Sequence, residues 1–400
     1  MADAVRAARS KYGVGLFARR ELRAGEAALR ERPLLFVVCG GRRHTVCAVC
    51  GEQGSRVRWA CAGGCGAHYC SRACLEADGH GAHAARLCRR LGRAPSACKA
   101  AGVTHPDGAD AVRWALHALW LRESSPDRWH ALRRLEPRDE DPLPERAHEV
   151  LAVHTECGPR SADKLIDAIS LAYADEGEGE GARLIGSSEA VAHAPPLPLL
   201  RHQPLLRLLL RDALNSTCLT VDPTKFGGSP TDAAMREPAV VCTYATLCLA
   251  NHDCAPTCAR VDSRPAMRYG EVELRCMMDV PAGAEVTMSY LPMGATRHER
   301  RERLLSTHAF ECACERCQCE AAEERDGEGT TEHASYFSLV QLRHVCPSCE
   351  GTLYPHPRAR KGETRYVCNN WPCNYSRSEQ EFFELLEEAF GYGGGGDESE

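Results

Sequence analysis

The sequence has no long run of apolar residues and no leader segment. Its apolar stretches fall short of the roughly 20 residues that a membrane span needs. Its first residues, MADAVRAARSKYGVG, lack the apolar core of a signal peptide. We therefore expect an intracellular protein, in the cytoplasm, the nucleus or both, that does not contact a membrane.

An excess of positive charge is also missing. The formal net charge is -6, and only five of the 49 basic residues are lysine. There is no candidate recognition helix with clustered basic residues, so direct binding of nucleic acid is not expected. No repeat of solenoid period is evident. The 400 residues are enough for two or more domains with a substantial core.

Cysteine, in contrast, is abundant and clustered. Of 24 cysteines, seven lie between Cys47 and Cys88, three between Cys312 and Cys317, and four between Cys346 and Cys373. In a reducing compartment such clusters bind metal more often than they form disulfides. We therefore predict zinc sites, against the alternative of unligated buried thiols.

The first cluster provides eight soft ligands within 42 residues. They are Cys47, Cys50, Cys61, Cys65, Cys70, Cys74, His83 and Cys88. Zinc takes four such ligands in a tetrahedron, so eight imply two ions. Four residues separate His83 from Cys88, which would place them about 140° apart on an ideal helix. The helix must bulge or end early, or His80 replaces His83.

The last cluster consists of Cys346 and Cys349, two residues apart, and Cys368 and Cys373, four residues apart. The first spacing is typical of a zinc ligand pair, and the second is wider than usual. This pattern predicts a zinc-ribbon-like module that joins two hairpins.

Apolar periodicity divides the rest of the chain. Residues 12–38 predict short strands, and strands return in VVCTYATLCLA, MRYGEVELRCMMDV and AEVTMSYL. Helices are predicted at 111–121, 163–174, 205–214, in ATRHERRERLLSTH and in EQEFFELLEEAF. The stretch at 175–181 is too acidic and glycine-rich to pack, and the tail at 391–400 is expected to be disordered.

Four separated segments carry the candidate site. They are KYGVGLFA (11–18), NHDCAP (251–256), PAGAEVTMSYL (281–291) and FECACERC (310–317). In this order they resemble the SET domain, and the first cysteine cluster, which lies between the first two, resembles the MYND zinc finger. The chain is thus similar to the SET and MYND domain (SMYD) family of protein-lysine methyltransferases.

The resemblance implies that the chain methylates lysines of histones or other proteins with S-adenosylmethionine. It assigns cofactor contacts to Lys11, Gly13, Gly15, Asn251, His252, Tyr290 and Phe310. Phe310 would stack on adenine, and the Tyr290 hydroxyl would orient the lysine and the sulfonium as the catalytic group. Methyl transfer is an in-line displacement, which needs alignment and exclusion of water more than acid–base groups. The glycines could instead form an ordinary turn, and His252 and Tyr290 could be core residues.

The resemblance also groups the metal ligands. One MYND site would use Cys47, Cys50, Cys70 and Cys74, and the other Cys61, Cys65, His83 and Cys88. A post-SET site would use Cys254, Cys312, Cys314 and Cys317. With the C-terminal cluster, three or four zinc ions are expected. Cys258 is left without a role and is expected to be a buried thiol.

Several positions depart from the family pattern. Asp253 and Thr257 replace a serine and an asparagine of the Asn-His motif, and His308 stands where a second channel tyrosine is usual. Thr217 falls where another channel aromatic is expected. The alternative function is therefore a catalytically weak adaptor that binds partners through its zinc fingers.

The expected fold is α+β, with SET β-sheets interrupted by a finger and a helical insertion. The expected parts are SET at 1–46 and 216–292, finger at 47–88, insertion at 89–215, post-SET segment at 293–320, C-terminal module at 321–390 and tail at 391–400. We expect a monomer that binds a protein substrate and, at the finger, a peptide partner.

Overall fold

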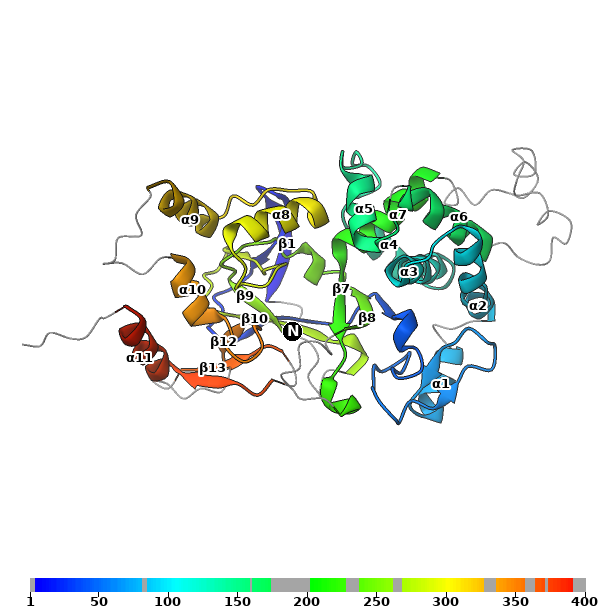
Figure 1. The fold of residues 1–400 in the computed structure, drawn as a ribbon, viewed down its shortest axis with the longest axis horizontal. Coiled ribbons are helices and arrows are strands. Elements are labelled where there is room, and N and C mark those ends of the chain that lie inside the picture. The colour runs from blue at the N-terminus through cyan, green and yellow to red at the C-terminus, as the bar shows by residue number, and fades with distance from the viewer. Residues whose placement is uncertain are drawn as a thin grey trace, which may run out of the picture.

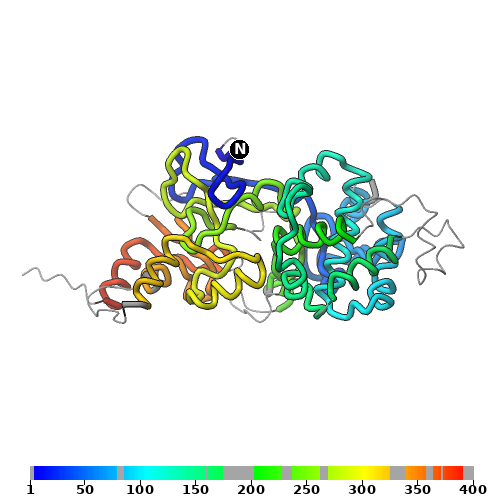
Figure 2. Tube along the Cα trace, turned by 90° about the horizontal axis from the view of Figure 1, so that it is seen from above, coloured from blue at the N-terminus to red at the C-terminus, as the bar shows by residue number. Residues whose placement is uncertain are grey.

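The molecule is elongated, with the helices of the insertion gathered in one half and most strands, together with the later helices, in the other (Figures 1 and 2). The computed structural model describes residues 4–80, 85–158, 160–173, 202–227, 237–261, 268–326, 336–356, 364–370 and 373–390. The predicted loop at 175–181 and the tail at 391–400 lie outside these residues. Within the described ranges, no helix has both the length and the apolar character to cross a bilayer.

Small antiparallel sheets form the strand-rich half. Three of them have the orders β1-β2-β11, β3-β10-β9 and β4-β8-β7. Their strands are β1 (Val5–Ser10), β2 (Gly13–Ala18), β3 (Ala27–Glu31), β4 (Leu35–Val38), β7 (Ser216–Thr220), β8 (Pro238–Thr243), β9 (Cys258–Val261), β10 (Val272–Cys276) and β11 (Glu285–Val286). Each of these sheets combines strands from before and after the helical insertion, so the two chain segments build one core.

The helical half has its own core. Its helices are α2 (Ala85–Ala100), α3 (Pro106–Ser124), α4 (Pro126–Arg133), α5 (Ala147–Thr155), α6 (Ser161–Tyr173) and α7 (His202–Asn215). Their apolar faces bury a continuous cluster in which Trp114 is fully buried. The Trp114 indole N–H donates to Thr243 Oγ1 at 2.9 Å, which links α3 to the end of β8. The two halves are therefore joined by a buried polar contact as well as by apolar packing.

The first cysteine cluster lies beside this helical half. It contains the short hairpin β5 (Trp59–Ala60) and β6 (His68–Tyr69), followed by α1 (Arg72–His80). Cys88 belongs to α2, the first helix of the insertion. The insertion helices therefore begin within the expected finger rather than at residue 89.

A buried turn ends the apolar strand before the Asn-His segment. The sequence predicts a strand through residue 250, but β8 stops at Thr243 and a short 3-10 helix follows at Leu247–Leu249. The Glu31 carboxylate accepts hydrogen bonds from the backbone N–H groups of Ala245, Thr246 and Leu247, at 3.0, 2.9 and 2.8 Å. An anion satisfies the free N–H groups at the start of a helical turn. Glu31 thus directs the chain toward residues 250–252.

The helix after the third motif begins and ends at well-defined caps. In α8 (Arg297–His308), Thr296 and Glu299 form a reciprocal capping box. The helix ends where Ala309 adopts a left-handed conformation with φ of 58°. This reversal turns the chain from His308 toward Phe310 and the cysteines that follow.

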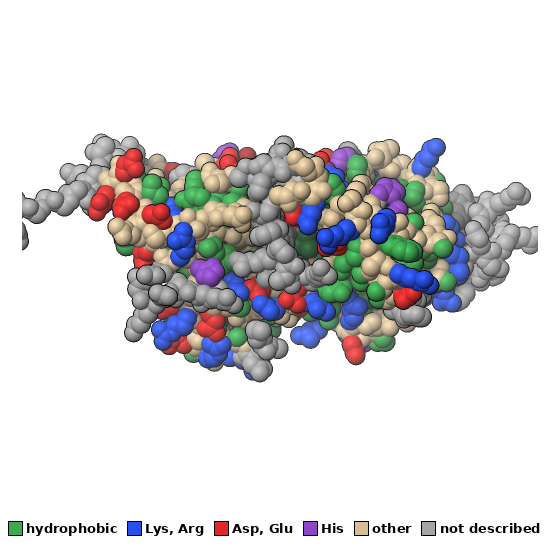
Figure 3. Space-filling view, turned by 90° about the horizontal axis from the view of Figure 1, so that it is seen from below, with side chains coloured by type: hydrophobic (Ala, Val, Ile, Leu, Met, Phe, Trp, Pro, Cys, Tyr) green, Lys and Arg blue, Asp and Glu red, His purple; other side chains and the backbone are tan. Residues whose placement is uncertain are grey.

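The C-terminal module packs on the strand-rich half. Helix α9 (Glu315–Asp326) leads into it from the segment at 293–320. The module contains α10 (Tyr336–His344), a sheet of β12 (Leu353–Pro355), β13 (Arg365–Cys368) and β14 (Ser376–Ser378), and α11 (Glu379–Phe390). Val340 and Tyr354 pack with Ala259, Val261 and Met277 of the core. Acidic side chains gather at the end of the molecule where α11 lies, and basic side chains lie mainly over the middle and the helical half (Figure 3).

Candidate functional site

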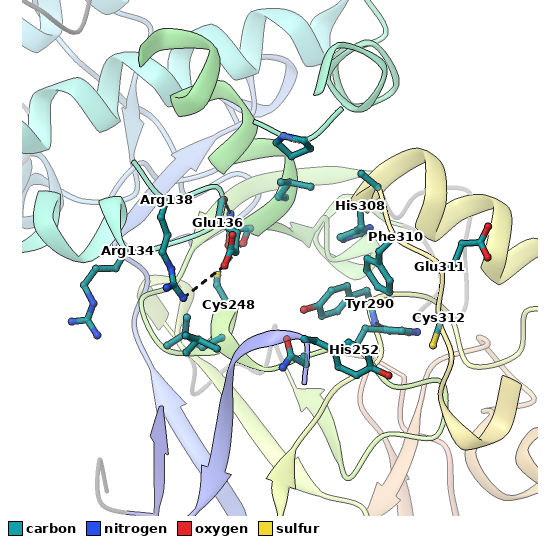
Figure 4. Close-up of a pocket in the computed structure, with 18 residues that line it drawn as sticks. Arg134, Glu136, Arg138, Cys248, His252, Tyr290, His308, Phe310, Glu311 and Cys312 are labelled. Atoms are coloured by element: carbon teal, nitrogen blue, oxygen red, sulfur yellow. Dashed lines mark hydrogen bonds and ion pairs between the residues drawn. The ribbon is translucent and has the colours of Figure 1, made fainter. Parts of the chain in front are cut away.

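One pocket of about 400 Å³ gathers residues from all four motif segments and from the helical insertion (Figure 4). That volume lies in the range of small-molecule binding sites. The pocket is lined by Tyr12, Val14, Arg134, Glu136, Arg138, Pro144, Leu214, Asn215, Cys248, Leu249, Asn251, His252, Tyr290, His308, Ala309, Phe310, Glu311 and Cys312. Lys11 is not among them, and its ammonium lies 4.6 Å from the centre of the Tyr12 ring.

The glycine segment approaches Asn251 closely. A Cβ atom on Gly15 would lie 2.8 Å from Asn251 Nδ2 and would also clash with Glu285 Oε1. Gly13 has a φ of 111°, which side chains rarely adopt. The Asn251 amide donates to Ser10 Oγ at 3.0 Å and to Glu285 Oε1 at 2.7 Å. Both glycines are therefore required by local geometry, and the side-chain N–H groups of Asn251 are held by protein atoms.

His252 is buried between the pocket and Cys254. Its Nδ1 accepts the backbone N–H of Tyr290 at 3.0 Å, and its Nε2 lies 3.2 Å from Cys254 Sγ. Burial lowers the pKa of His252 to about 4, so the ring is neutral near pH 7. Because Nδ1 accepts, the proton is on Nε2 and donates to the sulfur. Both ring nitrogens thus have protein partners.

Tyr290 presents its ring to the pocket. Its hydroxyl donates to the carbonyl of Ala250 at 2.9 Å. Burial raises the pKa of this hydroxyl, so it stays protonated at neutral pH. Backbone hydrogen bonds hold the strand that leads to Tyr290 against the Asn-His segment. The Met288 N–H donates to the Asn251 carbonyl at 3.0 Å, and the Asp253 N–H donates to the Met288 carbonyl at 3.1 Å. The Asn-His segment and the Tyr290 strand are therefore held side by side.

Aromatic rings from the end of α8 cover Tyr290. The His308 ring lies 4.9 Å from the Tyr290 ring, centroid to centroid. Phe310 lies edge-on to Tyr290 at 6.5 Å and inclined to His252 at 6.0 Å. The His308 Nδ1 atom is 2.7 Å from Thr307 Oγ1. Burial lowers the pKa of His308 to about 4, so a neutral imidazole faces the pocket.

The opposite wall contains residues that sequence reasoning missed. Glu136 and Arg138, between α4 and α5, form an ion pair of 3.7 Å, and Glu136 Oε1 lies 4.0 Å from where a Gly13 Cβ would be (Figure 4). Burial raises the pKa of Glu136. The Cys248 thiol donates to the Asn215 carbonyl at 3.0 Å. No local pattern marks Glu136 or Cys248, although Glu285 lies within a quoted motif and could have been assigned.

The cysteines assemble into separate groups whose sulfur atoms lie within 4.8 Å of one another. The groups of four are Cys47, Cys50, Cys70 and Cys74; Cys254, Cys312, Cys314 and Cys317; and Cys346, Cys349, Cys368 and Cys373. Each could hold one metal ion. Each group joins cysteines far apart in sequence, as the ligand sets expected from the resemblance require.

The remaining cysteines of the first cluster form a group of three, Cys61, Cys65 and Cys88. The Sγ atoms of Cys61 and Cys88 are 3.6 Å apart. The expected fourth ligand, His83, lies outside the described residues, and so does the side chain of His80. The structure therefore brings together three of the four ligands expected for this site.

Thr217 and Cys258 do not line the pocket, and each contacts a residue of another strand. Thr217 lies on β7, where its hydroxyl accepts a hydrogen bond from Arg260, and it does not line the pocket. Cys258 is fully buried, with its Sγ 3.8 Å from that of Cys276 on the neighbouring strand. The description of Cys258 as a buried thiol is confirmed.

The chain is similar in sequence to several lysine methyltransferases and to a SET and MYND domain-containing protein. Histone-lysine N-methyltransferase ASHR2 of Arabidopsis thaliana is 26% identical over 402 residues, which cover 89% of this chain and 91% of that protein. Histone-lysine N-methyltransferase SMYD3 of Homo sapiens is 34% identical over 110 residues, or 28% of this chain and 24% of that protein. A SET and MYND domain-containing protein of Dictyostelium discoideum is 30% identical over 128 residues, or 32% of this chain and 23% of its own length.

A solved structure of the SET domain of LSMT bound to lysine and AdoHcy aligns with a TM-score of 0.34 and 13% identity, covering 78% of this chain and 53% of that one. The SET domain family model matches residues 13–291, which is more than half of the chain. The chain therefore belongs to the SET domain family, as the sequence resemblance predicts, and a SET and MYND domain-containing protein is among its relatives.

Proposed function

We propose that the chain is an S-adenosylmethionine-dependent protein-lysine methyltransferase that acts on lysines of histones or other proteins. The observation that carries this proposal is the pocket itself. Asn251, Tyr290 and Phe310 come from three distant segments and line one cavity of about 400 Å³. The names of the relatives, several of them histone-lysine methyltransferases, support the same reaction class.

The pocket residues fit the chemistry of the proposed cofactor. When bound, S-adenosylmethionine would supply a methyl group carried on a sulfonium. The Phe310 ring offers a surface for adenine, and the Glu136 carboxylate offers an acceptor for sugar hydroxyl groups. With its N–H groups donated to Ser10 and Glu285, Asn251 retains its carbonyl oxygen as an acceptor. The absence of a side chain at Gly15 lets the backbone lie against Asn251 and Glu285, which a Cβ would displace.

We assign Tyr290 the orienting role. Its hydroxyl is fixed by the Ala250 carbonyl and keeps its proton, so its oxygen can accept a hydrogen bond from an incoming amine. Methyl transfer needs the amine, the methyl carbon and the leaving sulfur in line. The rings of His308 and Phe310 help to exclude water around the reacting groups.

Structural zinc is part of the proposal. Four sulfurs at about 2.3 Å from a tetrahedral zinc ion lie about 3.8 Å from one another. Sulfur pairs in the three groups of four are separated by 3.5 and 3.7 Å, 3.9 and 3.6 Å, and 3.8 and 3.4 Å. We propose two ions in a MYND finger at 47–88, one in a post-SET segment at 293–320 and one in the module at 321–390.

A second candidate function rests on His308. Its imidazole occupies the place beside Tyr290 where the family usually has a tyrosine hydroxyl. A chain that binds cofactor but transfers methyl groups poorly could act as an adaptor, with a peptide partner at the finger. This candidate shares the fold and the zinc sites and differs only in turnover.

A methyl-transfer assay separates the two candidates. Purified protein is incubated with S-adenosylmethionine labelled in its methyl group, and with histones or a cell extract. Cofactor binding is measured in parallel by calorimetry. Label on protein lysines supports the enzyme. Cofactor binding without transfer to any protein supports the adaptor, and absence of cofactor binding contradicts both assignments of the pocket.

A further inference from the structure

Two fully buried arginines lie beneath the post-SET cysteines. Arg300 of α8 and Arg316 of α9 are each 0% exposed, and Glu320 between them is 4% exposed. Glu320 binds both guanidinium groups, with Arg316 Nε 2.7 Å from its Oε1. The buried charges are thus partly paired, and one positive charge remains in excess over the one carboxylate.

Arg300 directs its N–H groups at two sulfur atoms. Its Nε lies 3.2 Å from Cys254 Sγ, and its Nη2 lies 3.8 Å from Cys317 Sγ. Four thiolates around a divalent zinc ion carry a net charge of about -2, which is costly to bury without a cation nearby. Arg300 supplies that cation at the sulfurs themselves. It also donates to the Ala295 carbonyl at 2.7 Å, which fixes its position.

Cys254 connects this cluster to the pocket. It is the one ligand of its group that comes from the Asn-His segment, because the other three lie at 312–317. Its sulfur receives N–H groups from both Arg300 and His252. His252 in turn accepts the backbone N–H of Tyr290 at 3.0 Å. An unbroken chain of contacts therefore runs from Arg300 through Cys254 and His252 to Tyr290.

We propose that Arg300 is a positioning residue that holds Cys254 in the thiolate cluster and thereby fixes His252 and the backbone of Tyr290. Loss of metal from this cluster would loosen Tyr290 even though no cysteine sulfur takes part in methyl transfer. The link to catalysis rests on the proposed function, but the structural link from Arg300 to Tyr290 does not.

The first test compares Arg300→Met with Arg303→Met, the same change at an exposed position of the same helix. Outer contacts to a metal ligand typically contribute 10- to 100-fold in metal affinity. Competition with a chelator should show one zinc equivalent bound at least about tenfold more weakly in Arg300→Met alone. Alkylation followed by mass spectrometry should find the newly reactive thiols at 312–317. Unchanged zinc affinity in Arg300→Met would overturn the proposal.

The second test measures how well the Tyr290 backbone is held in place, and it does not depend on enzyme activity. Hydrogen–deuterium exchange measures the Tyr290 amide, whose proton is bonded to His252 Nδ1. Exchange should be about fivefold faster or more in Arg300→Met, as expected for loss of one hydrogen bond, and unchanged in Arg303→Met. Zinc loss with unaltered exchange at Tyr290 would refute the coupling.

If Arg300→Met does not fold, the same coupling is tested by removing zinc from the wild-type protein. Stepwise addition of chelator should raise exchange at Tyr290 in parallel with alkylation at 312–317. If alkylation is complete while the amide stays protected, the proposal is wrong. If wild-type protein binds no S-adenosylmethionine, the proposed function fails, whereas these zinc and exchange measurements still decide the role of Arg300.

Discussion

The imidazole of His308 lies against the ring of Tyr290, with centroids 4.9 Å apart and planes inclined by 31°. The Tyr290 hydroxyl points to the Ala250 carbonyl, so the stacked histidine does not take its hydrogen bond. Histidine at position 308, in place of the usual tyrosine, therefore removes one hydroxyl from the pocket. The position of the Tyr290 hydroxyl is still set by the backbone carbonyl of Ala250.

Replacing Tyr290 with phenylalanine keeps this ring packing and removes the hydroxyl. If the hydroxyl orients the amine, its contribution arises mainly in the transition state. Turnover should fall tenfold or more, since a well-placed polar contact contributes on the order of 2 kcal/mol, while cofactor affinity stays nearly constant. Steady-state kinetics on a peptide substrate and calorimetry measure the two quantities.

The complementary change is His308→Tyr, which restores the usual channel residue. Turnover should rise, because the pocket regains a hydroxyl beside Tyr290. Cofactor affinity serves as the control and should match that of the wild type. If His308→Tyr and wild type both bind cofactor and neither transfers a methyl group, the enzyme assignment is wrong and the adaptor assignment stands.

The neutral state of His308 predicts a pH dependence of stability. Burial, together with the nearby His154, lowers the pKa of His308 to about 4, whereas an unfolded histidine titrates near 6.5. Between these values the unfolded chain binds more protons, so the free energy of unfolding falls as the pH drops. From pH 7.5 to 5.5, wild type should lose about 1 kcal/mol more than His308→Tyr. Denaturant titrations at both pH values measure this, and equal losses would show that His308 titrates normally.

Gly15→Ala tests the close approach to Asn251. The added Cβ would lie 2.8 Å from Asn251 Nδ2, so the amide and Glu285 must move out of place. We expect cofactor affinity to fall by about 5- to 150-fold, as for loss of one or two polar contacts. Gly41→Ala is the matched control, because nothing lies within 4 Å of its Cβ. Equal cofactor affinity in both variants would place the cofactor elsewhere.

Metal analysis tests the cysteine groups. We expect three or four zinc ions per chain, and removal of zinc should unfold the surrounding segments because metal binding free energy contributes to folding there. Plasma emission spectrometry of purified protein gives the stoichiometry, and circular dichroism before and after chelation gives the structural effect. A value of one zinc or fewer per chain would refute these sites.

Local patterns predicted much of this architecture. Apolar residues recurring at helical spacing predict α3, α6 and α7, and the structure confirms these helices. The spacing of the cysteines was enough to pair neighbours into clusters. The end of the β8 strand was misjudged, because the Glu31 carboxylate that stops it lies more than 200 residues away.

The sequence predicts the pocket only in part, because some of its residues meet through contacts between distant parts of the chain. Motifs identified Asn251, Tyr290 and Phe310, whose neighbours in sequence mark them. Glu136 joins the pocket through the packing of the insertion, and nothing adjacent to it in sequence signals that contact. The engagement of both His252 nitrogens also depends on tertiary partners, the Tyr290 N–H and the Cys254 sulfur.

The helix α2 has a consequence for how a partner would be presented. It runs without a break from Ala85 to Ala100, so Cys88 and the buried Leu91 and Ala97 of the insertion core share one helix. A finger that shares a helix with its neighbour cannot swing as a tethered module on a flexible linker does. If a peptide binds at the finger, as we propose, it would be held at a set angle and distance from the Tyr290 pocket, and its length, rather than hinge motion, would determine which of its residues reach the pocket.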